Sequence, residues 1–284
     1  MKKGISIHIG VNTVDEGHYG SDLIPLDTCE QDAIDMQKLA LSQNFKSTFL
    51  LLSENATRGA VHAAIVSASE ELTSGDMLML TYSGHGGFVL DKSGDEDDNL
   101  DETWCLYDAQ LLDDELYELW GGFEEGVRII ILSDSCHSGT VAKANRDSKS
   151  SKDVSKMFKE KLLPMNIAKE VYWNNDEFYS DVEALIDVEK TKNIKASIKL
   201  MAACQDPQVS YTMTFSKNSI FTEQLLKVWD EGEFVGSYDE LFSVIKERVE
   251  SMDFLPTVQT PNLYNVGKED PSFNTQKPFQ IYET

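Results

Sequence analysis

Two segments of this sequence bring together the residue types that thiol chemistry needs. His85 stands between glycines in the segment YSGHGG, and Cys136 stands among small polar residues in the segment SDSCHSG. Each segment follows a continuous apolar run, Met77–Thr81 in the first case and Val127–Leu132 in the second. Such runs are typical of buried parallel strands, whose carboxyl ends meet at one edge of a sheet. We therefore expect the histidine and the cysteine to lie together there, as a nucleophilic thiol requires.

The two side chains have complementary roles. An imidazole beside a thiol stabilises the thiolate as an ion pair and passes a proton to a leaving amine. His85 is the candidate for this role, because neighbouring side chains of an extended segment point to opposite faces and His137 would face away from Cys136. The N–H groups exposed by the glycines around His85 could also bind an oxyanion.

The first half of the chain predicts alternating strands and helices that would position this pair. Strands are expected at residues 5–9, 48–52 and 77–81, with helices over 30–42 and after the capping residue Thr57. This β-α-β-α-β order predicts an α/β fold with a parallel sheet and right-handed crossovers.

The second half is less regular. Residues 88–90 and 103–107 could pair as a hairpin within an acidic stretch, followed by a helix over 114–120. Residues 140–195 contain no strong strand pattern, and the tail after Asn265 shows little periodicity. A core strand is expected at 196–203, and the two helices expected after it are 220–229 and 238–250.

Composition limits the possible partners and compartments. The formal net charge of −24 over 284 residues argues against nucleic-acid binding. This charge either serves solubility alone or draws basic peptides toward an acidic cleft. No apolar run is long enough for a membrane span, and the amino-terminal run is too short for a signal peptide. Four cysteines without paired spacing favour a reduced, cytoplasmic protein and indicate neither a zinc site nor a disulfide framework.

The chain resembles the caspase-like cysteine peptidases, and in particular the metacaspase branch. The segments that carry the resemblance are YSGHG (82–86), GDEDDNLDE (94–102), LDDEL (112–116), DSCHSG (134–139), ACQDPQ (203–208) and QTPN (259–262). The sequence departs from animal caspases at the nucleophile, where DSCH replaces the Gln-Ala-Cys pattern. No long prodomain is expected before the first strand. The resemblance implies the dyad His85–Cys136, with the N–H groups of Gly86 and Cys136 as oxyanion donors.

The resemblance also implies a fold and its division. The expected architecture is one caspase-like α/β domain, with a mostly parallel central sheet of about six strands and helices on both faces. Residues 1–139 would form the part like the large subunit, with the dyad. Residues 140–195 would be a basic, mobile linker and insertion, and residues 196–284 the part like the small subunit.

Substrate specificity is a further implication of the resemblance. Metacaspases cleave after Arg or Lys, and the matching pocket acids would be Asp134 and Asp32, with Ser83 helping to line the pocket. Asp134 and Cys136 are two positions apart on an extended strand end, so their side chains should face the same way. Asp32 could instead be only an acidic residue in the first turn of a helix, where the dipole favours it.

The acidic stretch between residues 91 and 114 has two interpretations. It could be a solvated charged loop, or it could supply oxygen ligands to a hard cation, above all calcium. It is not an EF-hand loop, since the glycine required after the third ligand position is absent. Many metacaspases need calcium, and the matching positions here would be Asp101, Asp113 and Asp114.

The segment after Cys136 predicts self-cleavage. Residues 141–156 are rich in serine and basic residues and poor in apolar ones, as an exposed proteolytic site would be. The candidate sites are Lys143, Arg146, Lys149 and Lys152. An ordinary basic surface loop that balances the acidic face is the alternative.

Together these observations predict a cytoplasmic, monomeric cysteine endopeptidase that acts on basic peptides or proteins, is stimulated by calcium and processes itself. One alternative is a catalytically idle adaptor that works by binding, and another is a protease that cleaves after Asp. A cysteine phosphatase is discarded, because it would need an arginine where Ala142 stands.

Overall fold

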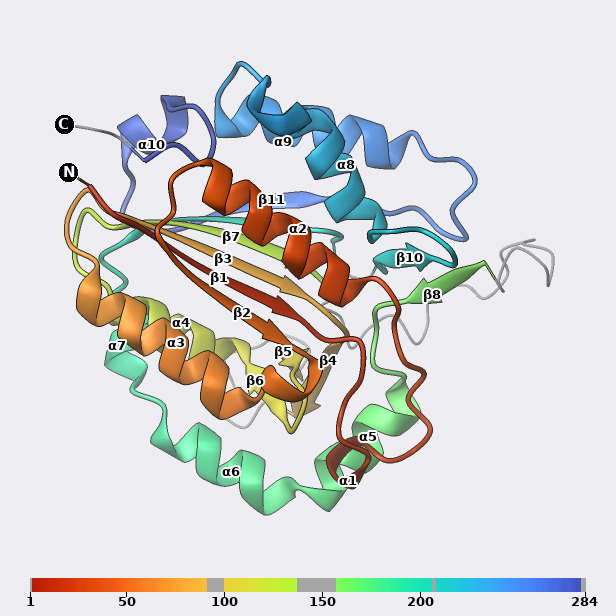
Figure 1. Cartoon of the computed structure of the whole chain (residues 1–284). Coiled ribbons are helices and arrows are strands. Elements are labelled where there is room, and N and C mark those ends of the chain that lie inside the picture. The colour runs from red at the N-terminus through yellow and green to blue at the C-terminus, as the bar shows by residue number, and fades with distance from the viewer. Residues whose placement is uncertain (1, 91–99, 137–156, 206–207, 282–284) are drawn as a thin grey trace.

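The computed structural model describes residues 2–90, 100–136, 157–205 and 208–281. Its centre is a six-stranded sheet with the order β11-β9-β7-β3-β1-β2 (Figure 1). The strands of this sheet are β1 (Gly4–Gly10), β2 (Ser47–Leu52), β3 (Met77–Ser83), β7 (Arg128–Asp134), β9 (Ser197–Ala202) and β11 (Asn262–Gly267). All neighbours are parallel except β11, which runs antiparallel to β9. The expected mostly parallel sheet of about six strands is thus confirmed.

Continuous apolar runs form the middle of the sheet because both of its faces are covered. Every residue of β1, β3 and β7 is buried. Alternate side chains of β3 enter different clusters: Met77 and Met79 lie in one, and Leu78 and Leu80 lie in the other. This period of two is the geometry of a strand buried on both sides.

Helices cover the two faces of the sheet, as expected (Figure 1). The helices of one face are α2 (Cys29–Ser42), α8 (Ile220–Trp229), α9 (Tyr238–Glu250) and α10 (Pro271–Thr275). The helices of the other face are α3 (Arg58–Glu71), α4 (Asp113–Gly121) and α7 (Val188–Lys192). The predicted cap is present, because Thr57 Oγ1 accepts a hydrogen bond from Ala60 N at 3.2 Å.

Smaller elements surround the carboxyl end of the sheet. The strands outside the central sheet are β4 (Gly86–Leu90), β5 (Leu100–Cys105) and β6 (Gln110–Leu112), which form a three-stranded sheet, and β8 (Phe158–Glu160) and β10 (Tyr211–Met213), which form an antiparallel ribbon. The remaining helices are α1 (Glu16–Tyr19), α5 (Met165–Asn174) and α6 (Asp176–Leu185), with 3₁₀ turns at Ser53–Asn55 and Asp230–Gly232. A hairpin is present as the antiparallel pair β4–β5, but its register differs from the expected one. Residues 88–90 lie opposite 100–102 rather than 103–107, and Thr103 and Trp104 lie opposite Gly87 and Gly86.

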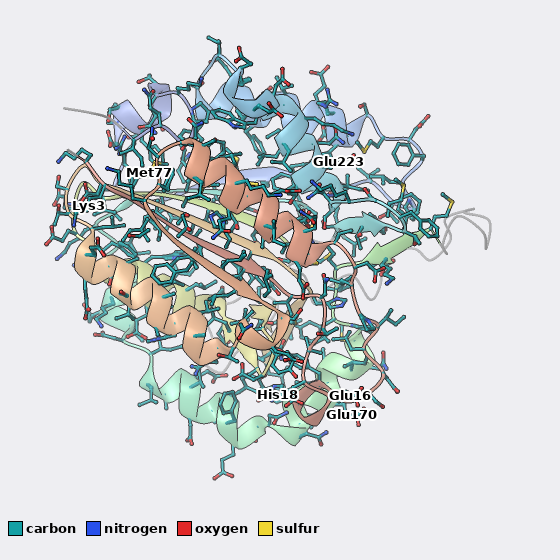
Figure 2. The ribbon with its side chains drawn as sticks, in the orientation of Figure 1. Lys3, Glu16, His18, Met77, Glu170 and Glu223 are labelled. Carbon is teal, nitrogen blue, oxygen red and sulfur yellow. The ribbon has the colours of Figure 1, made fainter. Side chains whose placement is uncertain are left out.

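The parallel strands begin at one edge of the molecule and end at the other. Lys3 and Met77 mark the beginning, where Met77 N donates to the Lys3 carbonyl at 3.0 Å (Figure 2). Glu16 and His18 of α1 lie near Glu170 of α5 on the far side (Figure 2). The carboxyl ends of β3 and β7 therefore point toward β4 and the β8–β10 ribbon. None of the helices in the described ranges is long and apolar enough to cross a lipid bilayer.

Candidate active site

The two strands that carry the histidine and the cysteine are hydrogen-bonded neighbours. β3 and β7 run parallel with Ser83 opposite Asp134, the last residue of each strand. His85 lies two residues beyond Ser83, and Cys136 lies two residues beyond Asp134. The parallel sheet therefore brings both side chains to the same edge.

The environment of His85 makes it a neutral base. Its side chain is 5% exposed, and Nε2 lies 3.2 Å from the carbonyl oxygen of Ile24. Because a carbonyl only accepts hydrogen bonds, Nε2 carries the proton and Nδ1 presents its lone pair. Nδ1 is buried and has no hydrogen-bond partner among the described residues. Burial lowers the pKa of His85 from 6.5 to about 4, and the nearby charge of Lys161 adds to this effect.

The thiol of Cys136 is oriented by the backbone at the start of β10. Cys136 is fully buried, and its Sγ accepts a hydrogen bond from Ser210 N at 2.8 Å. Ser210 also donates its hydroxyl to Asp134 Oδ1 at 2.8 Å. Asp134 and Cys136 thus face the same neighbour, as their spacing on an extended strand end predicts.

Two backbone N–H groups converge on one carbonyl oxygen beside the thiol. Gly86 N and Cys136 N lie 2.9 and 3.2 Å from the carbonyl oxygen of Lys161. A Cβ atom at position 86 would stand 1.5 Å from the Cys136 carbonyl oxygen, so only glycine fits there. The structure therefore forms a two-donor site of the kind that stabilises an oxyanion.

A lysine side chain fills the adjoining pocket. Lys161 is fully buried, and its Nζ lies 3.0 Å from Asp134 Oδ1 and 3.9 Å from Asp32 Oδ2. The same ammonium donates to Ser83 Oγ at 2.8 Å and to Ser219 Oγ at 3.0 Å. Asp32, Ser83 and Asp134, named from the sequence, therefore surround one buried cation.

The two carboxylates are also held by the amino-terminal turn of α8. Asp32 accepts hydrogen bonds from Ser219 N at 2.9 Å and from Ser83 Oγ at 2.7 Å. Asp134 accepts from Thr222 N at 3.2 Å and from Thr222 Oγ1 at 2.7 Å. Free N–H groups and the positive end of the helix dipole favour anions at this place. The pocket therefore keeps its carboxylates in fixed positions.

The charges in the pocket depend on one another. Burial raises the pKa of Asp32 to about 6, although the lysine opposes this rise. Burial by itself would lower the pKa of Lys161, but Asp134 and Asp32 outweigh it, and the pKa is held well above its usual 10.5. Removing the lysine would leave two carboxylates close together without a cation, which is unfavourable in a buried site.

The segment that carries Lys161 lies along the site as an extended peptide. β8 pairs antiparallel with β10, and Lys161 N donates to the Ser210 carbonyl at 3.0 Å. Beyond the lysine, Leu163 N donates to the Gly86 carbonyl at 2.7 Å, and Gly86 and Leu162 form a parallel bridge. The chain is thus fixed on both sides of the Lys161–Leu162 bond.

The three residues matched to a calcium site lie on two different elements. Asp101 is buried on β5, whereas Asp113 and Asp114 open α4. Within the described ranges, no three His, Cys, Asp or Glu side chains form a group that could hold a metal ion. Residues 91–99, which contain the rest of the acidic stretch, lie outside those ranges. The calcium site stays a prediction.

Several predicted residues lie outside the described part of the chain. These are His137 and the self-cleavage candidates Lys143, Arg146, Lys149 and Lys152. Conversely, sequence reasoning missed the Ile24 carbonyl, Ser210, Ser219 and, above all, the position of Lys161 in the pocket. Lys161 lies in residues 140–195, which were expected to be a basic linker, and the alternation in FKEKL (158–162) indicates a short strand.

Comparison with protein families gives a match over almost the whole chain. Residues 9–278 match the family model described as caspase domain. A crystal structure of a protein from Geobacter sulfurreducens is 42% identical with a TM-score of 0.85, and the alignment covers 99% of this chain and 100% of that one. Caspase-1 from Spodoptera frugiperda shares the fold at 12% identity, with a TM-score of 0.53 over 93% of this chain and 88% of that one.

Curated relatives match over shorter stretches. Metacaspase-1 from Saccharomyces cerevisiae is 44% identical over 71 residues, which is 23% of this chain and 16% of the yeast protein. Metacaspase-1 from Arabidopsis thaliana is 33% identical over 128 residues, which is 40% of this chain and 35% of the plant protein. The chain thus matches well under half the length of these relatives.

Proposed function

Since the chain belongs to the caspase-domain family, we propose that it is a cysteine-type endopeptidase that cleaves peptide bonds after lysine or arginine. The observation that supports this specificity is Lys161, which lies fully buried between Asp32 and Asp134 with its carbonyl oxygen on two N–H groups. A lysine bound in this way has the position that a substrate residue before a scissile bond would occupy.

The pocket discriminates by charge. Two buried carboxylates attract a cationic side chain and would repel the carboxylate of an aspartate substrate. A residual cavity of about 10 Å³, lined in part by Asp32, Asp134 and Thr222, leaves room for about one water beside them. The guanidinium of an arginine could displace that water and donate to both carboxylates in its plane. Cleavage after Asp is therefore the disfavoured alternative.

The dyad carries out the chemistry in two halves. Sγ of Cys136 attacks the carbonyl carbon while Nδ1 of His85 takes the thiol proton, and the oxyanion that forms binds the N–H groups of Gly86 and Cys136. His85 then gives its proton to the leaving amine, and the carbon–nitrogen bond breaks to leave a thioester. Water, deprotonated by His85, releases the acid and restores the thiol. The Ile24 carbonyl holds the imidazole orientation throughout.

Three fluorogenic peptides test this proposal. The sequences Phe-Lys-Glu-Lys, Phe-Lys-Glu-Arg and Phe-Lys-Glu-Asp copy residues 158–161 and vary only the last position. The first two should be hydrolysed and the third ignored, and Cys136→Ala should abolish hydrolysis. Faster hydrolysis of the Asp peptide would refute the proposed specificity.

A catalytically idle adaptor is the alternative from a different class. The close placement of His85, Cys136 and the two N–H donors favours an enzyme, because a binding protein has no need of a nucleophile. An acyloxymethyl ketone peptide that ends in lysine distinguishes the two. Covalent labelling of Cys136 and its loss in His85→Ala support the enzyme, and absence of labelling supports the adaptor.

We propose calcium as an activator, because the acidic residues named from the sequence lie on neighbouring elements. Asp113 and Asp114 open α4, which follows β6 directly and contacts β5, the strand that carries Asp101. Carboxylates so placed at the start of α4 are suitable oxygen ligands for a hard cation. The expected affinity is weak, about 10⁻⁴–10⁻³ M, because the site is not an EF-hand. Hydrolysis that is unaffected by chelator would refute calcium activation.

The proposed working state is a cytoplasmic monomer that acts on basic peptides or proteins. The four cysteines are free and buried, which suits a reducing compartment. Light scattering during size-exclusion chromatography tests the oligomeric state, and a dimer mass would refute the monomer.

A further inference from the structure

We propose that a cavity beside β9 and β11 is a second ligand site, which binds a small organic ammonium ion with an aromatic or aliphatic body. The cavity has a volume of about 370 Å³ and is lined by residues of β5, α4, β7, β9 and β11. Small-molecule sites in proteins usually have volumes of about 300–1,000 Å³. Binding at this site is independent of the peptidase activity proposed above.

The cavity and the catalytic pocket lie on opposite faces of the central sheet. Ser133 lines the cavity, whereas Asp134, the next residue of β7, lines the catalytic pocket. Neighbouring side chains of a strand point to opposite faces. Leu116 and Trp120 also line the cavity, and they belong to α4, which lies on the other side of the sheet from α2 and α8 (Figure 1). A ligand in the cavity would therefore not compete with a lysine in the catalytic pocket.

The inner part of the cavity is apolar. Four buried residues form it: Trp104, Leu116, Trp120 and Ala202. Trp104 is held on two sides, because its ring stacks on Tyr82 with 4.6 Å between the ring centres and its Nε1 donates to Ser133 Oγ at 3.1 Å. A wall whose side chains are already fixed can bind the apolar body of a ligand with little loss of side-chain entropy.

The outer part of the cavity is aromatic and acidic. Tyr117 of α4 is partly exposed and Tyr264 of β11 is exposed, and both line the cavity. The carboxylates of Glu102 and Asp113, which are partly exposed, are the only charged side chains in the described lining. Aromatic faces and carboxylates both attract an organic cation.

The lining as a whole selects the charge and the size of a ligand. An anion would meet two carboxylates and no basic side chain within the described lining. A bare metal ion would leave the apolar part unused, and a neutral apolar molecule would gain nothing from the carboxylates. An ammonium group in the outer part, with its body on the indole rings, uses both. Because Asp113 is also proposed to bind calcium, the test of charge depends on Glu102.

Isothermal titration calorimetry with phenylethylamine measures this binding. Phenylethanol keeps the aromatic body and lacks the charge, whereas ethylamine keeps the charge and lacks the ring. Wild type should bind phenylethylamine more tightly than either analogue by about tenfold or more, because only phenylethylamine uses both parts of the cavity.

Two variants act on the two parts of the cavity. Ala202→Leu fills the inner part and should abolish binding, whereas Ala63→Leu, at an exposed position of α3, should not change it. Glu102→Gln should weaken phenylethylamine by about fivefold and leave phenylethanol unaffected. Glu70→Gln, the same change at an exposed position of α3, should alter neither affinity. Glu102→Gln adds no volume, so it tests the site even if Ala202→Leu disturbs the fold.

A variant of the catalytic pocket separates the two acidic sites. Asp134→Asn should leave the affinity for phenylethylamine unchanged, and loss of binding in this variant would place the amine in the catalytic pocket and overturn the proposal. Equal affinities of wild type for phenylethylamine and phenylethanol, no binding at all, or wild-type affinity in Ala202→Leu would overturn it as well. Absence of peptide hydrolysis with normal amine binding would contradict the peptidase proposal alone.

Discussion

Lys161 and Lys199 are both fully buried lysines, yet they are held in opposite ways. Lys161 meets two buried carboxylates and two hydroxyl groups. Lys199 Nζ lies 3.1 Å from Asn265 Oδ1, 3.4 Å from the largely exposed Asp239, and 5.8 Å from the centre of the Phe273 ring. Two buried carboxylates and two hydroxyl groups surround the Lys161 ammonium, whereas the Lys199 ammonium has one amide oxygen and one exposed carboxylate as partners.

The elements that carry these lysines explain the difference. Lys199 lies on β9, between β7 and β11, and cannot leave without unfolding the sheet. Lys161 follows β8, whose strand partner is the three-residue β10. A buried charge on a central strand is part of the fold, but a fully paired charge on a peripheral ribbon has the character of a bound ligand. The following predictions test this contrast.

The largest effect is expected from removing one charge of the pocket. Asp134→Asn should lower kcat/KM for the lysine peptide, because the substrate ammonium would be buried without its close partner. The expected loss of binding free energy is about 2–5 kcal/mol. Asp239→Asn, the matched change at Lys199, should leave hydrolysis unchanged and alter the free energy of unfolding by less than about 1 kcal/mol. Steady-state kinetics and urea denaturation measure both, and equal effects of the two changes would contradict the contrast.

A second large effect concerns the carbonyl of Lys161 rather than its side chain. Gly86→Ala would place a methyl group against the Cys136 carbonyl and disturb both N–H donors, so kcat should fall by about 10²–10³. Gly59→Ala, on α3 with open space around it, is the matched control. It should keep full activity and add about 0.5–1 kcal/mol of stability. Wild-type kcat in Gly86→Ala would argue against this oxyanion site.

These first tests concern the part of the molecule that the sequence predicts best. Apolar runs such as Met77–Thr81 identify the central strands because burial on both faces demands them. The positions of His85 and Cys136 follow, since parallel strands end at one edge. The ribbon was not predictable in the same way: β8 and β10 have three residues each, and their pairing joins segments far apart in the chain.

The site itself was only partly predictable. Asp32 and Asp134 could be named from their motifs. The Ile24 carbonyl could not, because any residue type can supply a backbone carbonyl. The position of Lys161 in the pocket was not predictable for another reason. A lysine in a basic run is ordinarily solvated, and only the tertiary arrangement shows that this ammonium is fully enclosed.

A smaller effect should distinguish the two lysines in stability. In the Cys136→Ala background, which lacks the nucleophile, Lys161→Met should remove amide protection from residues 157–163 only. The free energy of unfolding should fall by no more than about 1 kcal/mol, because local opening hydrates the pocket. Hydrogen exchange with mass spectrometry measures this. A loss of about 3–5 kcal/mol across the sheet, as expected for a structural buried pair, would show that Lys161 belongs to the core.

A further effect is a pH dependence of the buried histidines, which lack the carboxylate partners of Lys161. Burial lowers the pKa of His8 to about 3 and that of His85 to about 4. Above pH 6.5 neither state binds these protons. As the pH falls from 6.5 toward 4, only the unfolded chain takes them up, so the free energy of unfolding should fall by about 1.4 kcal/mol per pH unit for each histidine.

Single variants isolate this contribution. Between pH 6.5 and 4, His8→Gln should reduce the slope of the unfolding free energy against pH by about 1.4 kcal/mol per pH unit. This is the contribution of one proton that only the unfolded chain binds. Ala63→Gln, an exposed change on α3 that removes no titratable group, should leave the slope unchanged. Asp32, whose pKa is raised to about 6, acts with the opposite sign between pH 6 and 3.8, so the variants must be compared with wild type. Equal slopes in all three proteins would contradict the assignment.

The attachment of the Lys161 segment to the same chain as its pocket also has a consequence for competition with other peptides. A tethered segment acts at an effective concentration on the order of millimolar, which an external peptide below that level cannot match. Dilution of the protein does not change this competition, because every molecule carries its own segment.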